Sequence, residues 1–299
     1  MLDEIQRDVP FGTEPGREHG VRCMRLNLDP VRVFPRPLIV YLLIHIGHYL
    51  TALCLHALGF RRGRTPHLAY WYRETSAASD APPIVFVHGL SLGLVSYLVF
   101  FTQLCRRHGA DRPLVFLHLD HLTYRFPRLG VPGRAEMIED VARLFERHQL
   151  APAVWMGHSF GTIICAWMCN LPDARRYVRR SVLVDPVCFQ LWEPDLTYNA
   201  IYRPPPNWLL QLMRCVVSSE HGIALTIGRH FWWYENLLLP EDLTHDTHIV
   251  LAEHDGIIDA CKLADYLDAN SVPYVLLPRA IHAQFLLQPS VAKTILALL

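Results

Sequence analysis

Short apolar runs alternate with amphipathic segments over the last three quarters of the chain. The apolar runs have the length of buried strands, and we expect strands at His67–Tyr72, Pro83–Val87, Pro113–Leu119, Ala153–Met156, Ser181–Val184, Thr247–Ala252 and Pro273–Leu277. Apolar residues at helical spacing predict helices at Ser96–Arg107, Arg134–His148, a segment that ends at Asn170, Ile258–Asn270 and Pro289–Leu299. Continuous apolar strands separated by helices indicate an α/β fold with a mostly parallel sheet that helices flank on both faces.

Two further segments fall outside this alternation. Residues 1–36 are rich in Pro, Gly and Arg and show no steady period, so we expect an irregular N-terminal arm. The stretch 188–246 is too long for an ordinary connection and is rich in aromatic residues, which predicts an inserted helical cap. The predicted core therefore has two parts, residues 65–187 and 247–299.

A long apolar segment precedes the core. Residues 37–60 contain no Asp, Glu, Lys or Arg, and arginines flank them on both sides. We expect residues 37–64 to form a hydrophobic helical segment, which is long enough to span a bilayer. His45, His48 and His56 share one stripe of such a helix, and a helix exposed to lipid all round should not carry them. A single span, an interfacial helix and a helix packed in a soluble cytoplasmic protein all remain open, with membrane association favoured.

Composition excludes some classes of function. Basic and acidic residues balance at 28 each, which gives no support for nucleic acid as a partner. The eight cysteines form no C-x-x-C pair, so we interpret them as reduced thiols in a reducing compartment. His118, Asp120 and His121 resemble a metal site, but adjacent strand positions point to opposite faces, and we expect neither a metal nor a cofactor.

The strongest chemical signal is Gly157-His158-Ser159-Phe160-Gly161, which lies between a predicted strand and a predicted helix. The strand must turn into the helix within a few residues, which strains the backbone at Ser159. Glycines on both sides remove the Cβ atoms that would collide there. The Ser159 hydroxyl is thereby exposed at a helix N-terminus, where developing negative charge is favoured. This context predicts a nucleophilic serine.

Several motifs in this order resemble the α/β-hydrolase fold superfamily. They are His88-Gly89 after a strand, the GHSFG turn, a late Asp after a strand and a final His, and the resemblance covers roughly Tyr70 to Leu299. It implies that the backbone N–H groups of Leu90 and Phe160 form an oxyanion hole. Gly89 would let the oxyanion loop fold close to the nucleophile.

The resemblance also implies a base and an acid. His282 alone of the seventeen histidines follows the final predicted strand, in a sequence similar to the family's H-x-x-F ending. Asp255 follows the strand at Thr247–Ala252 and is the preferred acid. Asp185 is the main alternative, because some family members use that position. Asp259 is a third candidate, but a helix N-cap is its more natural role.

These residues predict a serine hydrolase that cleaves a carboxylic ester through an acyl-enzyme. The aromatic cap and the apolar N-terminal segment favour a lipophilic ester or lipid substrate. The same three residues also fit an acyltransferase, a thioesterase or a perhydrolase. A catalytically silent scaffold on a membrane or lipid surface is a further alternative, and the oligomeric state is undetermined.

Overall fold

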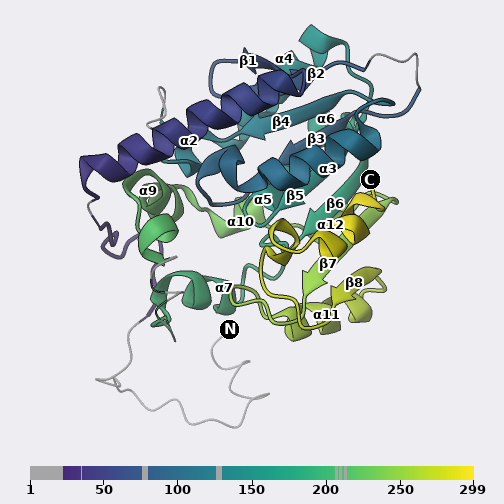
Figure 1. Ribbon diagram of the computed structural model, residues 1–299. Helices are drawn as coiled ribbons and strands as arrows, with labels where there is room; N and C mark the ends of the chain where they lie inside the picture. Colours follow the sequence, from purple (N-terminus) through teal and green to yellow (C-terminus); the bar gives the residue numbers. More distant parts are fainter. Residues whose placement is uncertain are drawn as a thin grey trace, which may run out of the picture.

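The core is an eight-stranded sheet in the order β1-β2-β4-β3-β5-β6-β7-β8 (Figure 1). The computed structural model describes residues 23–34, 36–75, 80–125, 130–205, 208, 211 and 214–299. Strands β3 to β8 run parallel, and β2 pairs antiparallel with both β1 and β4. The strands are β1 (Arg61–Arg64), β2 (Ala69–Arg73), β3 (Ile84–Val87), β4 (Leu114–His118), β5 (Ala153–His158), β6 (Val178–Val184), β7 (Thr247–Ala252) and β8 (Tyr274–Leu277). The predicted α/β fold with a mostly parallel sheet is confirmed.

Alternate strand residues bury against opposite faces of the sheet. Val85 and Val87 of β3 pack in the cluster that contains helices α4 and α5, whereas Ile84 and Phe86 pack with α3 and α12. This period of two is what an extended strand imposes. All four residues are fully buried, because helices cover the parallel sheet on both sides (Figure 1).

The helices of the core agree closely with the predicted ones. The long helices are α2 (Leu38–Ala57), α3 (Leu98–His108), α4 (Arg134–His148), α5 (Gly161–Asn170), α11 (Ala260–Ala269) and α12 (Pro289–Leu296). Short turns join them at η1 (Gly93–Tyr97), η2 (Asp120–Leu122), α6 (Pro172–Arg175) and η6 (Gln284–Leu286). The bounds of α4 coincide with those expected, because its apolar stripe is uninterrupted and Glu136 caps the N-terminus at Gly133.

The N-terminal helix is shorter than the predicted segment 37–64. Helix α2 ends at Ala57, and Gly59, with φ of +86°, follows the C-terminus and lets the chain leave the helix. Residues 61–64 form β1, which the sequence analysis assigned to the helical segment. That assignment is wrong. Three arginines and one glycine show no apolar alternation that would predict a strand, and these residues are extended because they pair with β2.

The stretch 188–246 consists of short helices, mostly of one or two turns. They are α7 (Asp195–Thr197), η3 (Tyr198–Tyr202), η4 (Arg214–Ser218), α9 (His221–His230), α10 (Trp233–Asn236) and η5 (Pro240–Asp242). Two hydrogen bonds attach it to α5: Trp167 Nε1 donates to Asn236 Oδ1 (3.1 Å), and Asn170 Nδ2 donates to the Leu237 carbonyl (2.7 Å). Of the residues singled out by sequence, Pro206 in the proline run lies outside the described residues.

The aromatic stack beside β3 generates a stability prediction. Phe101 of α3 is fully buried and stacks on Phe116 with ring centroids 3.9 Å apart. Replacing Phe101→Ala should lower the free energy of unfolding by about 3–5 kcal/mol, because it removes buried apolar contacts and leaves a cavity. Val99 lies on the same helix and is 60% exposed; Val99→Ala should change the value by no more than about 0.5 kcal/mol. Urea denaturation of both variants measures the difference, and equal losses would contradict this packing.

Candidate active site

The turn between β5 and α5 holds Ser159 in a strained conformation at the carboxyl edge of the sheet. Its φ is +50°, which is the left-handed region that non-glycine residues avoid. The amide of Ser159 donates to the Val184 carbonyl of β6 (2.9 Å), and its carbonyl accepts from the amide and hydroxyl of Thr162 (2.9 and 2.6 Å). These bonds hold a conformation that costs about 1–3 kcal/mol.

The three glycines around Ser159 lie where a side chain does not fit. A Cβ atom at Gly161 would be 2.2 Å from the Val87 carbonyl oxygen of β3, and one at Gly157 would be 2.7 Å from Cys165 Sγ. At Gly89 a Cβ would be 2.8 Å from the Cβ of Ser159. Backbone oxygens are also close at Gly157 (Gly161 O, 2.8 Å) and at Gly89 (His158 O, 3.0 Å), so the packing of these segments requires glycine at each position.

Three side chains that are far apart in sequence form one hydrogen-bonded chain at this edge. Ser159 Oγ lies 2.9 Å from His282 Nε2, and His282 Nδ1 lies 2.6 Å from Asp255 Oδ2. Asp255 Oδ1 accepts from the amides of Ile257 and Ile258 (2.7 and 3.1 Å), which fixes the carboxylate. The side chain of Asp255 is fully buried, and that of His282 is 17% exposed. Such a chain can take the hydroxyl proton of Ser159 onto the imidazole.

Two opposing effects set the charge of His282. Burial disfavours the imidazolium, but the charge and the hydrogen bond of Asp255, with a further contribution from Asp185, outweigh it and raise the pKa of His282 to about 9. Stabilisation of the imidazolium by a buried carboxylate is what a general base needs once it has accepted a proton.

Two backbone amides, one in the loop after β3 and one in the turn that carries Ser159, have no protein partner in the described part of the chain. Among the residues that the structure describes, neither the N–H of Leu90 nor that of Phe160 donates to a protein acceptor. Phe160 immediately precedes helix α5, and Leu90 lies in the loop after β3. Unpaired amides at a helix N-terminus are suited to an anionic oxygen.

Asp185, the alternative acid, lies beside the hydrogen-bonded side chains of Ser159, His282 and Asp255 and makes a different contact. Its Oδ2 accepts from the Ala283 amide (2.7 Å), next to His282. It is buried at 2% exposure with φ of +47°, and Ala283 also has positive φ, at +64°. Burial would raise the pKa of Asp185, but His158 and His282 hold it below the usual range. Asp259 accepts from the Lys262 amide (3.0 Å) as the N-cap of α11.

A second buried network, which sequence reasoning did not find, lies behind the first. Tyr97 accepts from the Gly89 amide (3.0 Å), and its hydroxyl lies 2.7 Å from His158 Nδ1. His158 Nε2 lies 3.7 Å from Asp185 Oδ2, beyond hydrogen-bond distance, and Asp185 in turn accepts from the Ala283 amide. The partner of Gly89 is set by tertiary packing of η1, and no local pattern in the sequence signals it.

Three ligand atoms in this region lie close enough to hold a metal ion. One atom each from His158, Asp185 and His282 lies within 4.8 Å of the others. Both ring nitrogens of His282 already have partners in Asp255 and Ser159. A metal at this position would withdraw His282 from Ser159, so it would compete with the hydrogen-bonded chain instead of supporting it.

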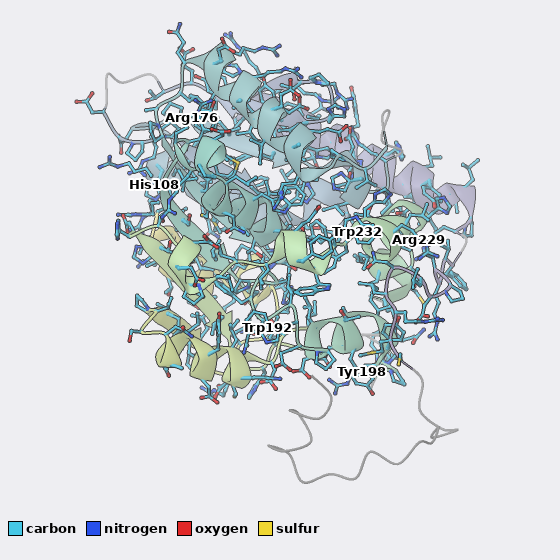
Figure 2. The ribbon with its side chains drawn as sticks, turned by 180° about the vertical axis from the view of Figure 1, so that it is seen from behind. His108, Arg176, Trp192, Tyr198, Arg229 and Trp232 are labelled. Carbon is cyan, nitrogen blue, oxygen red and sulfur yellow. The ribbon has the colours of Figure 1, made fainter. Side chains whose placement is uncertain are left out.

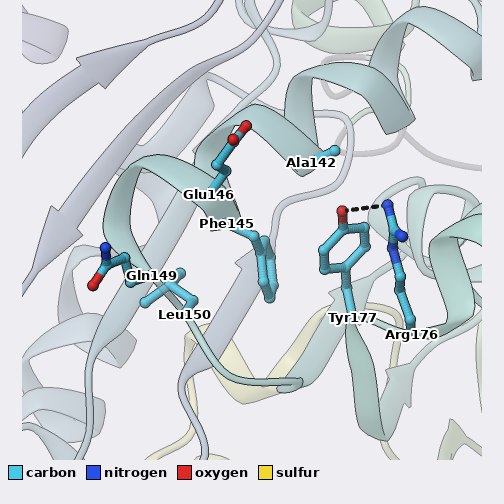
Figure 3. A pocket seen from close by; sticks show the side chains of 7 residues that line it. All are labelled: Ala142, Phe145, Glu146, Gln149, Leu150, Arg176 and Tyr177. Carbon is cyan, nitrogen blue, oxygen red and sulfur yellow. Dashed lines mark hydrogen bonds between the residues drawn. The ribbon is translucent and has the colours of Figure 1, made fainter.

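A cavity of about 660 Å³ lies away from this edge (Figure 3). It is lined by the C-terminal part of α4, including Phe145, by Leu150 after that helix, and by Arg176 and Tyr177 before β6. These residues stand at the amino edge of the parallel strands, whereas ligands of open α/β sheets bind at the carboxyl edge. The lining offers neither a nucleophile nor a paired base, so Ser159 and its partners are the candidate site.

Large aromatic side chains of the 188–246 stretch are exposed. Trp192, Tyr198 and Trp232, which Figure 2 labels, are 46%, 45% and 42% exposed. Side chains of this size usually bury most of their surface. Their exposure leaves apolar surface available for a ligand.

Comparisons with known proteins bear on the family and the fold of the chain. Residues 84–284 match the model of the Alpha/beta hydrolase family, whereas no curated protein sequence matches the chain. Among solved structures, a carboxylesterase from Bacillus subtilis aligns with a TM-score of 0.60 at 17% identity, over 86% of this chain and 97% of that one.

Two other solved structures have similar folds. A bacterial membrane phospholipase A has a TM-score of 0.58 at 15% identity, over 87% of this chain and 92% of that one. The enol-lactonase of Burkholderia xenovorans has a TM-score of 0.56 at 15% identity, over 80% and 99%. The family match spans more than half of the chain and includes Ser159, Asp255 and His282. The chain belongs to the alpha/beta hydrolase family.

Proposed function

We propose that the chain is a serine hydrolase that cleaves a carboxylic ester through an acyl-enzyme. The observation that carries this proposal is the chain of hydrogen bonds from Ser159 Oγ to His282 Nε2 and from His282 Nδ1 to Asp255 Oδ2. The fold supports hydrolase chemistry, since esterases and a lactonase are among its structural neighbours.

In the proposed mechanism, His282 accepts the proton of Ser159 as Oγ attacks the ester carbonyl carbon. The N–H groups of Leu90 and Phe160 stabilise the oxyanion of the tetrahedral intermediate. His282 then donates its proton to the departing alcohol, which leaves the acyl group on Ser159. A water molecule gives a proton to His282 and attacks the acyl carbon. His282 returns this proton to Ser159 Oγ as the bond between Oγ and the acyl carbon breaks, which releases the carboxylic acid and the free serine.

Asp255 is the proposed acid in this mechanism. Its carboxylate contacts His282 directly, whereas Asp185 contacts the backbone amide of the next residue. Asp255 fixes the tautomer that presents Nε2 to the serine and stabilises the imidazolium. Asp185 holds the loop that carries His282 and adds a second negative charge nearby.

A lipophilic ester is the proposed substrate class, with the stretch 188–246 as a cap over the site. The exposed aromatic side chains of this stretch and the apolar helix α2 support it. Helix α2 is long and apolar enough to cross a membrane, which supports attachment to a lipid surface. The cysteines are all free, which supports a reducing compartment for the catalytic domain.

A fluorophosphonate probe tests the nucleophile. The probe should label the wild-type protein, and Ser159→Ala should abolish labelling and lower ester hydrolysis by at least about 10³-fold. Ser290 is exposed at the start of α12, and Ser290→Ala should label as the wild type does. Equal labelling of the folded Ser159→Ala variant would contradict the assignment. Products formed with water and with an added alcohol separate hydrolysis from acyl transfer.

The two carboxylates should differ in mutational effect. Asp255→Asn should reduce kcat/KM by about 10³–10⁴-fold, because the amide stabilises the wrong tautomer of His282. Asp185→Asn keeps an oxygen that can accept from Ala283, so its loss should stay within about tenfold. Steady-state kinetics on a water-soluble ester measures both values. A larger loss in Asp185→Asn would reverse the assignment of the acid.

The pH dependence follows from His282. Only the neutral imidazole accepts the serine proton, and its raised pKa keeps it protonated at neutral pH. In the wild type, kcat/KM should therefore rise with pH to a plateau, with a midpoint near the pKa of about 9. Asp255→Asn removes the stabilising charge and should move this midpoint to lower pH. A midpoint that stays in place would show that Asp255 does not face His282.

A further inference from the structure

Helix α2 lies lengthwise against the core (Figure 1). Near its N-terminus, Tyr41 Oη donates to Glu220 Oε1 at the start of α9 (3.4 Å). Near its C-terminus, the His56 ring packs against Trp71 of β2 with centroids 5.0 Å apart. A helix packed on its own domain from end to end cannot cross a bilayer without drawing that polar domain into the hydrocarbon. The packing therefore restricts α2 to a position in the plane of a membrane surface.

The outward face of α2 is a continuous apolar stripe. Seven aliphatic side chains at spacings of three and four are 46–83% exposed: Leu38, Ile39, Leu42, Leu43, Ile46, Leu50 and Leu53. In contrast, His48 and Thr51 are buried. His48 bonds the Leu92 carbonyl of the core, and the Thr51 hydroxyl donates to the Gly47 carbonyl of its own helix. An apolar stripe of this extent on an isolated soluble protein marks an interaction surface.

The charges around the stripe favour an anionic lipid surface over a second copy of the chain. No acidic residue occurs between Asp29 and Glu74, and the exposed Arg32, Arg61 and Arg62 flank the two ends of the helix. Lipid phosphates would neutralise these arginines. In a two-fold pair of α2 helices, arginines would face arginines, because both ends of the helix are basic.

We propose that α2 is an in-plane docking helix whose outward stripe enters one leaflet of an anionic membrane and whose inward face positions the oxyanion loop through His48. The docking half is based on the exposed apolar stripe and on the arginines at the two ends of the helix. The positioning half rests on the proposed function, because it requires the Leu90 amide to act on the substrate.

The contact with the loop is made by one buried side chain. The Nε2–H of His48 donates to the Leu92 carbonyl (2.8 Å), and Nδ1 accepts from Arg125 Nε (3.1 Å). Burial lowers the pKa of His48 to about 4, so the neutral tautomer persists at neutral pH. Because Leu92 is two residues from Leu90, the helix that meets the lipid also restrains the loop that carries a proposed oxyanion donor.

Flotation of the full-length protein with vesicles tests the docking half. The protein should bind vesicles of phosphatidylcholine with phosphatidylglycerol, and Leu42→Gln with Leu50→Gln should weaken binding by at least about tenfold. The control pair Val99→Gln with Leu276→Gln replaces residues of similar exposure on α3 and β8 and should bind as the wild type does. Hydrolysis of a short water-soluble ester should stay unchanged in the Leu42 and Leu50 variant.

Three outcomes would overturn the docking half. One is equal flotation of the wild type and the Leu42 and Leu50 variant. The second is equal binding to vesicles of phosphatidylcholine alone, because the arginines would then have no role. The third is a wild-type dimer in sedimentation equilibrium that the same two substitutions convert to a monomer, with no binding to vesicles. None of these results depends on hydrolysis, so failure of the proposed function is seen separately with the fluorophosphonate probe.

Substitutions at His48 test the positioning half. His48→Leu should lower kcat on a water-soluble ester by about tenfold to a hundredfold, with KM and vesicle binding unchanged. His48→Gln should recover most of kcat, because its amide can donate to the Leu92 carbonyl. Thermal unfolding of both variants checks that they fold. Full kcat in His48→Leu, or no recovery in His48→Gln, would show that His48 has no influence on the loop.

Discussion

Helix α5 approaches strand β3 so closely that Gly161 has no space for a side chain, and the positions of Ser159 and of the Phe160 amide depend on this contact. A Cβ at Gly161 would be 2.2 Å from the Val87 carbonyl oxygen. The close approach forces β5 to turn into α5 at once, with Ser159 in the left-handed region. It also brings the start of α5, with the Phe160 amide, beside the loop that carries Leu90. One steric constraint thus fixes both the turn that carries the Ser159 hydroxyl and the position of the Phe160 amide next to it.

The parallel arrangement of the sheet positions the side chains of Asp255 and His282. Because the carboxyl ends of parallel strands meet at one edge, the loops after β5, β7 and β8 bring Ser159, Asp255 and His282 together. The loop after β6 adds Asp185, which holds the backbone beside His282 instead of its ring. The two carboxylates therefore have different partners. One contacts the imidazole and the other contacts the chain that carries it.

Much of this arrangement could be predicted from the sequence, because local patterns determine it. The strand β5, the glycines around Ser159 and the uninterrupted stripe of α4 each leave a short-range signal. Strand β1 left none, since Arg61–Arg64 has no apolar alternation and becomes a strand only by pairing with β2. The bonds of Tyr97 to Gly89 and of His48 to Leu92 are tertiary contacts between polar residues, which periodicity cannot reveal. For the same reason, the sequence left open whether α2 spans a membrane or lies on the core.

The central claim is that Ser159 carries the acyl group during turnover. Rapid acid quenching of the enzyme with an excess of a p-nitrophenyl ester, followed by mass analysis of its peptides, tests this claim most directly. The account predicts a burst of p-nitrophenol equal to the enzyme present and an acyl mass on the peptide that contains Ser159. An acyl mass on another residue, or steady hydrolysis with no acylated peptide at any time, would contradict it.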